Sequence, residues 1–518
     1  MTRCARLLRG RGSHPSSRWR PVRARRHHSG PQDLVLTTRA QQPARSSGKS
    51  RGGAQDVKGR GGAVPRVKGR NASAALAVRP ARRDEIGVAL VGWGTIGSGV
   101  IKLLEDRRRE IDARLGARLR LVGVADIDLK RKREVEVSRA LLTSRTQELI
   151  RDPKVDVVIE LMGGLEPART FVLDAIAHGK SIVTANKALL AHHGTEILAA
   201  AEARGVGCRF EASVGGGIPI IRTLREALAA DRQTAVFGIV NGTSNYILST
   251  MAAAGRSFAE VLADAQKAGL AEADPTYDVD GIDAAHKLTL LVQLAFGVRV
   301  ALDAVHTEGI RDVDASDMEY ARELGYAIKL LAIAKDHGNA IEARVHPTMI
   351  PAHDPLAAVS GAFNAVCVHG DALGRSMYYG QGAGMMPTAT AVVADVIDVA
   401  RDLRELGRPR LAPLGYPIAR QRVAKVRPIG DVMSEFYLRV HAQDEPGVLG
   451  RIASLLGQQK ISIASVVQRA RSSGGVVPIV IRTHETRERD LRRALDRVAK
   501  MPSVRGKPVA IRIEENPG

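Results

Sequence analysis

The sequence has little of the material that builds nucleic-acid stacking platforms, disulfide frameworks or membrane spans. Aromatic residues make up 3% of the 518 residues, which argues against the base-stacking surfaces of single-strand binders. The three cysteines, Cys4, Cys208 and Cys367, are too few and too scattered for a disulfide or zinc framework, which suits a reducing compartment. No apolar run reaches the roughly 18 residues that a membrane-spanning helix needs. We therefore expect a cytoplasmic chain of two or three domains with sizeable cores and no membrane partner.

The large positive charge is confined to the first part of the chain. The formal net charge is +22, yet 21 of the 77 basic residues and only 2 of the 55 acidic ones lie in residues 1–83. The remainder is close to neutral, so no nucleic-acid partner is expected for it. Residues 1–83 lack hydrophobic periodicity and are rich in Gly, Ser, Pro and Arg. They cannot bury enough apolar surface to offset their ordering entropy, so we expect a disordered tail. Three origins stay open: a solvated tail, an organelle transit peptide (so that organelle import is not excluded), or a start placed too far upstream.

A strand, three glycines and a helix follow this tail. An apolar run at 86–91 leads into Gly92, Gly94 and Gly97, and a helical pattern begins at Ile96. This is the G-x-G-x-x-G spacing of dinucleotide sites. The first glycine permits a tight turn, the second admits a pyrophosphate, and the third lets the helix pack closely on the strand. Because strand, turn and helix are all in place, the segment predicts dinucleotide binding rather than a purely structural turn.

Strands and helices then alternate up to about residue 215. Strand patterns begin at residues 155, 181 and 208, and helical patterns at 167–179 and 194–205 separate them. The alternation predicts a parallel, doubly wound sheet, whose ligands bind outside the carboxyl ends of the strands. Those ends carry Glu160, Gly163, Gly164, Asn186, Lys187, Glu211 and Gly215 to Gly217. Lys187 is expected to contact a ligand, the alternative being a surface lysine at a helix start.

The stretch "GLAEADPTYDVDGIDAAHK", residues 269–287, surrounds one lysine with carboxylates at the start of an apolar helix. Asp283 and Lys287 are four residues apart and therefore share a helix face. An ordinary helix-start ion pair would explain that spacing. The alternative is that the carboxylates aim a partly desolvated lysine, whose lowered pKa lets it transfer a proton near neutral pH.

These segments resemble one enzyme family. "GWGTIGSGV", "VVIELMGG", "VTANKALLA", "EASVGGGIPII", "NGTSNYIL" and the stretch at 269–287 resemble homoserine dehydrogenase in order and spacing, over about residues 85–415. The resemblance implies a nicotinamide-dependent oxidoreductase that interconverts L-homoserine and L-aspartate 4-semialdehyde in threonine, methionine and isoleucine biosynthesis. It also implies a Rossmann-type domain at 84–215 with a return segment at 385–415, and an α+β substrate and dimerisation domain at 216–384.

The resemblance assigns roles to individual residues. Lys287 matches the proton donor, Lys187 and Asp278 match further catalytic groups, and Glu272 and Asp283 match contacts to the substrate. The matching cofactor contacts are Gly92, Gly94, Thr95, Ile96, Gly97, Lys187, Gly269 and Gly384. The resemblance implies a structural sodium site at Glu211, Val214, Gly216 and Ile218. For the glycine loop that ends at Gly384, a plain hairpin loop is the alternative.

The choice between NAD and NADP stays open. The second strand ends in "VADIDLKRKRE", where Asp126 is placed to accept hydrogen bonds from a ribose 2′-hydroxyl, which favours NAD. Lys130 to Arg133 offer cations for the 2′-phosphate of NADP. Many relatives place a basic residue where this chain has Ile127, which argues against a strong NADP preference.

A separate unit begins near Ser434, after a linker at 427–433. An alternating strand, a turn at "DEPG", an amphipathic helix and a second strand predict a βαββαβ domain at 434–515. It resembles an ACT domain, a small-molecule regulatory module of amino-acid enzymes. We expect L-threonine as its effector, with Asp444 and Gly447 in the pocket; the alternative is a module that only mediates association. The family implies a homodimer or homotetramer.

Two other classes of protein compete with an enzyme. A ligand sensor built on a decayed dehydrogenase would not need a proton donor, so Lys187, Glu272, Asp283 and Lys287 argue against it. Nucleic-acid binding through the basic tail would need only residues 1–83, and its salt dependence would disappear with them. An oxidoreductase is the leading hypothesis.

Overall fold

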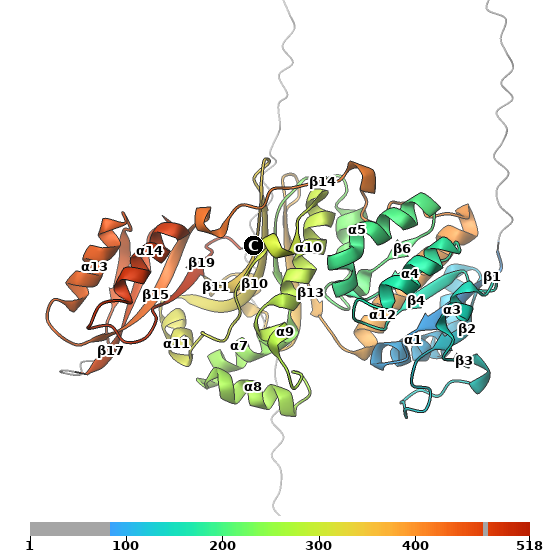
Figure 1. Cartoon of the computed structure of the whole chain (residues 1–518), viewed down its shortest axis with the longest axis horizontal. Helices are drawn as coiled ribbons and strands as arrows, with labels where there is room; N and C mark the ends of the chain where they lie inside the picture. The colour runs from blue at the N-terminus through green and yellow to red at the C-terminus, as the bar shows by residue number, and fades with distance from the viewer. Residues whose placement is uncertain (1–82, 470–474, 518) are drawn as a thin grey trace, which may run out of the picture. The chain divides into compact units, whose positions relative to one another are not determined.

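The computed structural model describes residues 83–469 and 475–517 (Figure 1). The expected disordered tail lies outside these residues, apart from Arg83, and stays a prediction. Among the described residues, no helix has the length and apolar character needed to cross a membrane.

The first domain is built on a six-stranded parallel sheet with the order β3-β2-β1-β4-β5-β6. In this register Val88 lies beside Val157, which in turn lies beside Ser181. The order runs outward from β1 in both directions, which confirms the predicted Rossmann-type, doubly wound arrangement. The strands are β1 (Glu85–Val91), β2 (Arg118–Ala125), β3 (Leu142–Thr143), β4 (Val157–Glu160), β5 (Ser181–Thr184) and β6 (Cys208–Arg209).

Strand β1 is buried on both faces because helices cover both sides of this sheet. Val88 and Leu90 join a core with α1 and α12, whereas Ala89 and Val91 join a core with α4 and α5. The apolar run at 86–91 is therefore the sequence of a strand covered on both sides. Helix α12 comes late in the chain but packs against α1, β4 and β5. The helices are α1 (Thr95–Asp106), α2 (Arg108–Leu115), α3 (Thr146–Arg151), α4 (Ala168–Ala177), α5 (Lys187–Arg204) and α12 (Met385–Leu406).

The second domain contributes the strands β13-β12-β7-β10-β11 to an eleven-stranded sheet. Helix α10 (Ile282–Phe296) is buried along nearly its whole length and packs against β7, β10 and α5 of the first domain. It therefore carries the lysine stretch to the junction with the parallel sheet (Figure 1). The remaining strands are β7 (Gln233–Ile239), β8 (Val298–Arg299), β9 (His306–Thr307), β10 (Tyr326–Asp336), β11 (Ile341–Pro351), β12 (Phe363–Gly370), β13 (Gly374–Gln381) and β14 (Arg422–Val423). The remaining helices are α6 (Ile220–Arg222), α7 (Gly242–Ala254), α8 (Phe258–Lys267), α9 (Thr276–Val279) and α11 (Ala315–Glu323).

The last domain has the predicted βαββαβ order and continues the same sheet as β19-β15-β17-β16. Strand β19 pairs in parallel with β11, Thr348 opposite Arg512 and Met349 opposite Ile513. The sequence patterns do not predict this junction. The elements are β15 (Met433–Gln443), α13 (Val448–Gln458), β16 (Ile463–Val467), β17 (Val476–Thr483), β18 (Thr486–Arg487), α14 (Glu488–Val498) and β19 (Val509–Ile513).

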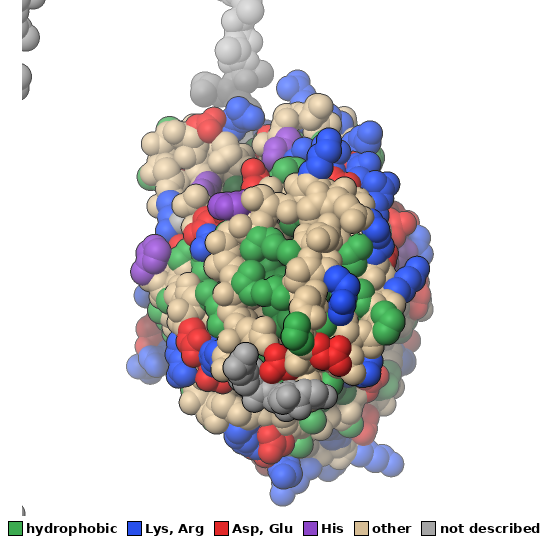
Figure 2. Space-filling view, turned by 90° about the vertical axis from the view of Figure 1, so that its left-hand side faces the viewer, with side chains coloured by type: hydrophobic (Ala, Val, Ile, Leu, Met, Phe, Trp, Pro, Cys, Tyr) green, Lys and Arg blue, Asp and Glu red, His purple; other side chains and the backbone are tan. Residues whose placement is uncertain are grey.

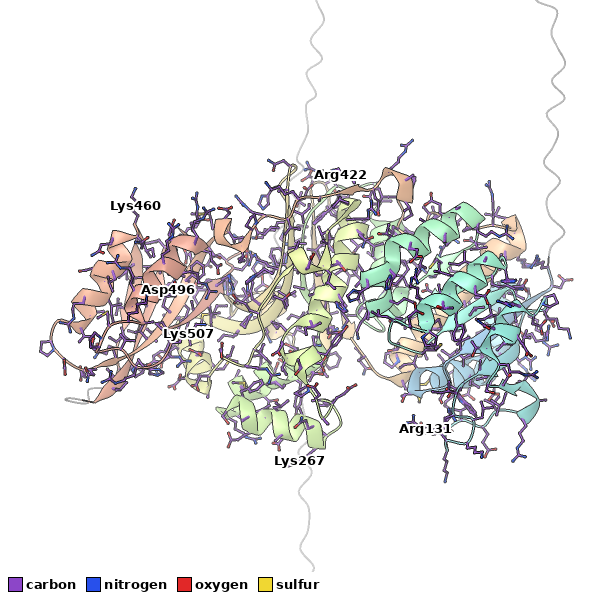
Figure 3. All side chains as sticks on the ribbon, in the orientation of Figure 1. Arg131, Lys267, Arg422, Lys460, Asp496 and Lys507 are labelled. Atoms are coloured by element: carbon purple, nitrogen blue, oxygen red, sulfur yellow. The ribbon has the colours of Figure 1, made fainter. Side chains whose placement is uncertain are left out.

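The surface of the last domain is mixed. Figure 2 looks onto the end that carries α13, β16 and β17, where hydrophobic side chains gather among charged ones. On these elements Leu449, Val466 and Val476 are exposed. Figure 3 shows charged side chains of the same domain, including Asp496 and Lys507.

Candidate active site

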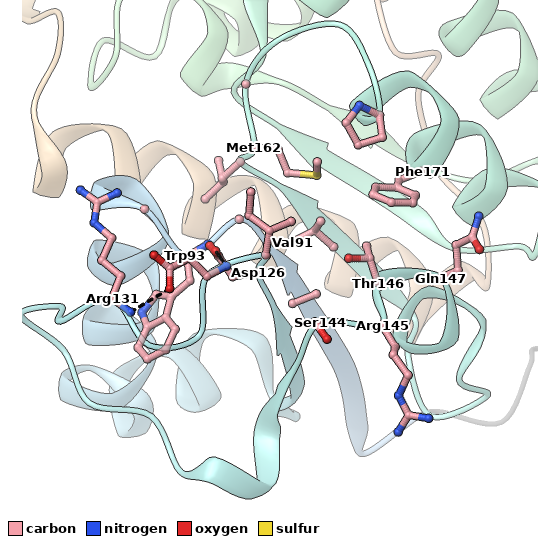
Figure 4. Close-up of a pocket in the computed structure, with 18 of the residues that line it drawn as sticks. Val91, Trp93, Asp126, Arg131, Ser144, Arg145, Thr146, Gln147, Met162 and Phe171 are labelled. Atoms are coloured by element: carbon pink, nitrogen blue, oxygen red, sulfur yellow. Dashed lines mark hydrogen bonds between the residues drawn. The ribbon is translucent and has the colours of Figure 1, made fainter.

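A cavity of about 980 Å³ opens at the carboxyl ends of β1, β2 and β4. Figure 4 shows Trp93, Asp126 and Arg131 on one side of it and Gln147 and Phe171 on the other. This is the edge where a doubly wound sheet binds its ligand. Gly92 and Gly94 of the fingerprint are among the lining residues, as is Gly163 after β4. Thr95, Ile96 and Gly97 lie next to the two fingerprint glycines at the start of α1.

The three glycines of the fingerprint differ in what surrounds them. Gly92 has φ +100°, and a Cβ there would meet the backbone of Leu161 at 2.6 Å. A Cβ on Gly97 would lie 2.3 Å from the carbonyl oxygen of Gly92, so this glycine lets α1 approach β1. A Cβ on Gly94 would meet nothing within 4 Å. The space beside Gly94 is therefore open for a ligand, as expected of the second glycine.

Asp126, at the end of β2, is held by the loop around it. Its Oδ2 accepts the backbone N–H of Trp93 at 2.7 Å, and its Oδ1 accepts that of Asp128 at 2.9 Å. The Arg133 guanidinium lies 3.2 Å from Oδ1 and stacks 4.2 Å from the centre of the Trp93 ring. Ile127, in contrast, is 95% exposed. The carboxylate thus lines the cavity but already accepts two backbone hydrogen bonds and forms an ion pair with Arg133.

Lys287 is buried one turn into α10 and holds two partners. Its Nζ donates to the carbonyl oxygen of Val240 at 2.6 Å and to Oδ2 of Asp283 at 2.7 Å. The other oxygen of Asp283 forms an ion pair with Nζ of Lys187 at 2.8 Å. Because Lys187 starts α5 after β5, this pair joins the carboxyl edge of the parallel sheet to α10. The structure therefore brings together three of the predicted residues.

Asn241 organises the same carboxylates. It caps α7 by accepting the backbone N–H of Ser244, and its Nδ2 donates to Asp278 at 2.7 Å and to Asp283 at 2.8 Å. Asp278 thus reaches the lysine cluster through Asn241. The motif "NGTSNYIL" carries the resemblance, yet sequence reasoning gives Asn241 no role. The only local signal is an asparagine before a helix, which predicts a cap.

The electrostatics of the cluster follow from one carboxylate shared by two ammonium groups. Burial alone would raise the pKa of Asp283, but Lys287 and Lys187 outweigh burial and hold it well below its usual range. Burial lowers the pKa of Lys287, repulsion from Lys187 adds to that effect, and the attraction of Asp283 opposes it only in part. Lys287 is therefore a readier proton donor than an exposed lysine.

Three aromatic side chains that sequence reasoning does not single out border the cluster. The hydroxyl of Tyr277 lies 2.5 Å from Nδ1 of His286, and the ring of His192 meets His286 edge-on at 5.2 Å. Nζ of Lys187 lies 5.8 Å from the centre of the Tyr277 ring. Burial lowers the pKa of His286. No spacing rule links these residues, since they come from three different helices.

Three predicted residues lie apart from the lysine cluster. The carboxylate of Glu272 is exposed and has no hydrogen bond or ion pair with any residue that the structure describes. Gly269 follows α8 with φ +70°, and Gly384 precedes α12 with φ +113°. A Cβ on either glycine would meet nothing closer than 3.5 Å. Both glycines are accessible to a ligand, but no contact in the structure shows that either of them binds the cofactor.

The predicted sodium loop, residues 211–218, is mostly buried, and hydrogen bonds to Glu211 hold its first residue in place. Both oxygens of Glu211 accept backbone N–H groups, from Ile221 and Arg222 at 2.8 Å each. Burial and the nearby Asp395 raise the pKa of Glu211 to about 7. Within 83–469 and 475–517, no cluster of three or more His, Cys, Asp or Glu side chains could hold a metal. Any cation here would depend on backbone oxygens.

Three family models match the chain: homoserine dehydrogenase at residues 219–397, the homoserine dehydrogenase NAD binding domain at 92–211, and the ACT domain at 436–503. The match at 92–211 covers the glycine turn after β1 and the strands β2 to β6 of the parallel sheet. Fold and site therefore define a nicotinamide-dependent oxidoreductase with an ACT domain at its end.

Individual relatives agree with this class. A homoserine dehydrogenase of Neisseria gonorrhoeae is 45% identical over 429 residues, which cover 83% of this chain and 98% of that relative. One of Bacillus subtilis is 41% identical, over 83% and 99% of the two chains. The crystal structure of a homoserine dehydrogenase from Thiobacillus denitrificans is 46% identical, with a TM-score of 0.79 over 84% of this chain and 99% of that one. The chain belongs to the homoserine dehydrogenase family.

Proposed function

We propose that Lys287 is the general acid and base for the interconversion of L-homoserine and L-aspartate 4-semialdehyde. The observation that carries the proposal is its buried ammonium, aimed by Val240 and Asp283 beside Lys187. When bound, the dihydronicotinamide supplies a hydride to the aldehyde carbon. The carbonyl electron pair then moves to oxygen, and Lys287 donates the proton that gives the alcohol. In the reverse direction neutral Lys287 takes the hydroxyl proton.

The remaining residues of the cluster position this proton transfer. Lys187 compensates the second oxygen of Asp283 and places a positive charge where the alkoxide develops. Asp278 and Asn241 fix Asp283 and, through it, Lys287. The test follows nicotinamide absorbance with L-homoserine and with each cofactor. L-Homoserine-dependent reduction of NAD or NADP supports the proposal, and its absence with both cofactors overturns it.

For the substrate, we propose that Glu272 and Asp283 bind the α-ammonium group. Glu272 is exposed and free of protein partners among the described residues, so its charge is available to a ligand. Glu272→Gln should raise KM for L-homoserine and leave cofactor affinity unchanged. A matched control is Glu105→Gln, an exposed position on α1. An unchanged KM for the Glu272 variant would mean that Glu272 has no role in substrate binding and is only part of the turn.

We infer that the cleft accepts both NAD and NADP and that Asp126 and Arg131 share the discrimination. Asp126 lines the cavity beside the glycine turn, and Arg131 is an exposed cation in its wall (Figure 4). A hyperthermophilic archaeal relative, 25% identical with a TM-score of 0.52 over 63% of this chain and 99% of that one, is a complex with NADPH. Asp126→Ala should shift the preference toward NADP, and Arg131→Ala toward NAD. An unaltered ratio in both variants would place the discrimination elsewhere.

We propose that the loop at 211–218 holds a structural Na⁺ through backbone carbonyl oxygens. Val214 and Gly216 are buried, and among the described residues no hydrogen bond reaches their carbonyl oxygens. Buried carbonyls without donors fit a hard cation. With Ile218 and Glu211 they form the predicted ligand set. Thermal unfolding in NaCl should occur at a higher temperature than in N-methylglucamine chloride of equal ionic strength. Equal midpoints would contradict the site.

We propose that L-threonine regulates the enzyme through the ACT domain, and that the reaction serves threonine, methionine and isoleucine biosynthesis. The turn between β15 and α13 has Gly447 at φ +85°, so backbone there is open to a ligand. An effector acts only if it binds the less active state more tightly. Titrating L-threonine against the full chain and a chain ending at Val426 tests this. Inhibition that persists after truncation, or that is absent from both chains, contradicts it.

We propose a cytoplasmic homodimer or homotetramer. Strand β13 ends the large sheet with one strand partner, and its Tyr379 is exposed and stacked on Phe363 at 5.1 Å. At the other end of the sheet, β16 exposes Val466. A second copy covering one or both ends would bury these side chains. Light scattering gives the mass, and Tyr379→Ser should weaken association. A monomer at all concentrations contradicts the proposal.

A further inference from the structure

One edge of β11 changes its partner partway along its length. Strand β9 pairs with it in parallel at Arg344 and Val345, and β19 pairs with it in parallel at Thr348 and Met349. Between these two pairings, Pro347 has no N–H to offer a neighbour. A cavity of about 420 Å³ opens at this change of partner. It lies between the second domain and the last domain, away from both the dinucleotide cleft and the turn at 444–447.

Three segments form the walls of this junction cleft: residues 308–313 after β9, residues 507–511 at the start of β19, and Arg492 of α14. The charges at its base are already paired. Glu308 meets Arg512 at 2.8 and 2.9 Å and Arg492 at 2.9 Å. Glu488 accepts from the same two arginines, so the two carboxylates balance the two guanidinium groups and fix the shape of the cleft.

Two further charged groups of the walls have no such partner. Lys507 and Asp312 are exposed and line the cavity, and neither side chain has a hydrogen bond or ion pair with the described residues. Figure 3 shows the Lys507 side chain on this part of the last domain. Between them the lining is apolar, with Val313, Pro347 and Ile511. One spare cation, one spare anion and an apolar wall match a small zwitterion with a short aliphatic side chain.

We propose that the junction cleft binds an α-amino acid with a short aliphatic side chain. Its carboxylate pairs with Lys507, its ammonium group pairs with Asp312, and its side chain packs against Val313 and Pro347. This site is separate from the effector turn at Asp444 and Gly447, neither of which lines the cleft.

Residues 308–313, which form one wall of the cleft, also contact Val279 and Asp280, next to Asp278 of the candidate active site. Ile310 N–H donates to the carbonyl oxygen of Val279 at 2.8 Å, and Arg311 donates to Asp280 at 2.5 Å. A Cβ on Gly309 would lie 2.5 Å from the Val279 oxygen, so no side chain separates the two segments. Asp278, next to Val279, holds Asn241 and hence Asp283. A ligand that shifts residues 308–313 therefore acts on the segment that aims Lys287.

Calorimetric titration of the full chain tests binding. The probes are L-alanine, L-valine, L-threonine and L-isoleucine, with inorganic phosphate as an anion that lacks the ammonium group. Lys507→Gln and Asp312→Asn should each weaken binding by about tenfold or more, because each removes one charged contact. The matched controls Lys500→Gln and Asp496→Asn, both exposed on or next to α14, should bind as the parent does. Three results overturn the proposal: no amino acid binds, phosphate binds equally well, or binding is unchanged in both cleft variants. A further variant, Gly447→Val, alters the turn between β15 and α13. If only this variant loses amino-acid binding, the amino acid binds at that turn and the proposal is overturned.

Coupling has its own test. The bound amino acid should change KM or kcat for L-homoserine in the parent, and Arg311→Met should reduce that change while leaving binding intact. This part rests on the proposed dehydrogenase reaction. If the parent lacks activity without any amino acid, the proposed function fails and calorimetry still decides the cleft. If binding occurs and the kinetics do not respond, coupling between the cleft and Lys287 is overturned.

Discussion

Asp283 neutralises only one of the two ammonium groups that it faces. Lys287 and Lys187 sit on its two oxygens at 2.7 and 2.8 Å, and Asp283 is 2% exposed. Asp278 compensates the second positive charge only from a distance, through Asn241, so the two ammonium groups keep a positive potential beside Asp283. Such a potential stabilises an alkoxide and at the same time loosens the proton of the buried lysine.

The first prediction concerns the proton itself. Lys287→Ala should lower kcat on the order of 10²–10⁴-fold, as expected for loss of a general acid, while cofactor affinity stays close to that of the parent. Lys267→Ala is the control, since this lysine is exposed on α8 (Figure 3). Steady-state kinetics and cofactor titration measure the two quantities. Turnover of the Lys287 variant close to that of the parent would remove Lys287 from the role.

The pH dependence gives the second prediction. The pKa of Lys287 lies below its usual range because of burial and Lys187. Aldehyde reduction needs the ammonium form, so its kcat should fall as pH rises through this lowered pKa, and kcat for alcohol oxidation should rise there. Lys187→Met removes the repulsion and leaves Asp283 to Lys287 alone, so the transition should move to higher pH. A transition that stays in place in the Lys187 variant would contradict this assignment.

The sequence predicts the local part of this site and not its three-dimensional part. The pair Asp283 and Lys287 follows from helical spacing, and the structure confirms it at 2.7 Å. The contact from Asn241 to Asp283 spans 42 positions, so it exists only once β7 and α10 have packed. For Glu272 the sequence predicts too much: the motif places it at the site, but in the structure its side chain lies in solvent.

Among the elements, the turn from β1 into α1 depends on two glycines for different reasons. Gly97→Ala should destabilise the first domain and abolish cofactor binding, because its Cβ would lie 2.3 Å from the oxygen of Gly92. Gly94→Ala is the matched variant: no atom lies within 4 Å of its Cβ, so the fold should persist while cofactor affinity falls. Thermal unfolding with cofactor titration separates the two effects. Equal unfolding temperatures in the two variants would contradict this distinction.

Elements that alternate in sequence are also the best predicted part of the fold. The parallel sheet follows from runs buried on both faces, such as 86–91, and the last domain from its alternating strand and amphipathic helix. The pairing of β11 with β19 involves two residue pairs in segments more than 150 positions apart. Both strands alternate polar and apolar side chains where they pair, and nothing local selects this register.

At the scale of the whole molecule, the last domain is attached by more than a linker. Asp317 of α11 is fully buried, and it accepts hydrogen bonds from Arg439 at 2.6 and 2.9 Å and from Tyr437 at 2.8 Å. A chain ending at Val426 keeps all the residues predicted for catalysis and cofactor binding. We expect it to fold and bind cofactor, but with lower stability, because Asp317 loses the charged partner that neutralises it.

Asp317→Asn provides the control for this truncation. In the truncated chain it removes the unpaired charge and should recover part of the lost stability. In the full chain it breaks the pair with Arg439 and should destabilise. Denaturant unfolding of the four proteins measures the coupling. A truncated chain that is unfolded even with Asp317→Asn would contradict the expectation that residues before Val426 fold alone.

The continuous sheet has a consequence for synthesis on the ribosome. Strand β11 ends at Pro351, but the strand that covers its edge is made of residues 509–513. During translation the second domain therefore emerges with the part of the β11 edge beyond β9 unpaired, and this part stays unpaired until residues 509–513 leave the exit tunnel. Such an edge pairs readily with other nascent chains. Strand β19 therefore completes the sheet, so chains that stall or are cut before residues 509–513 should be the ones that aggregate or recruit chaperones.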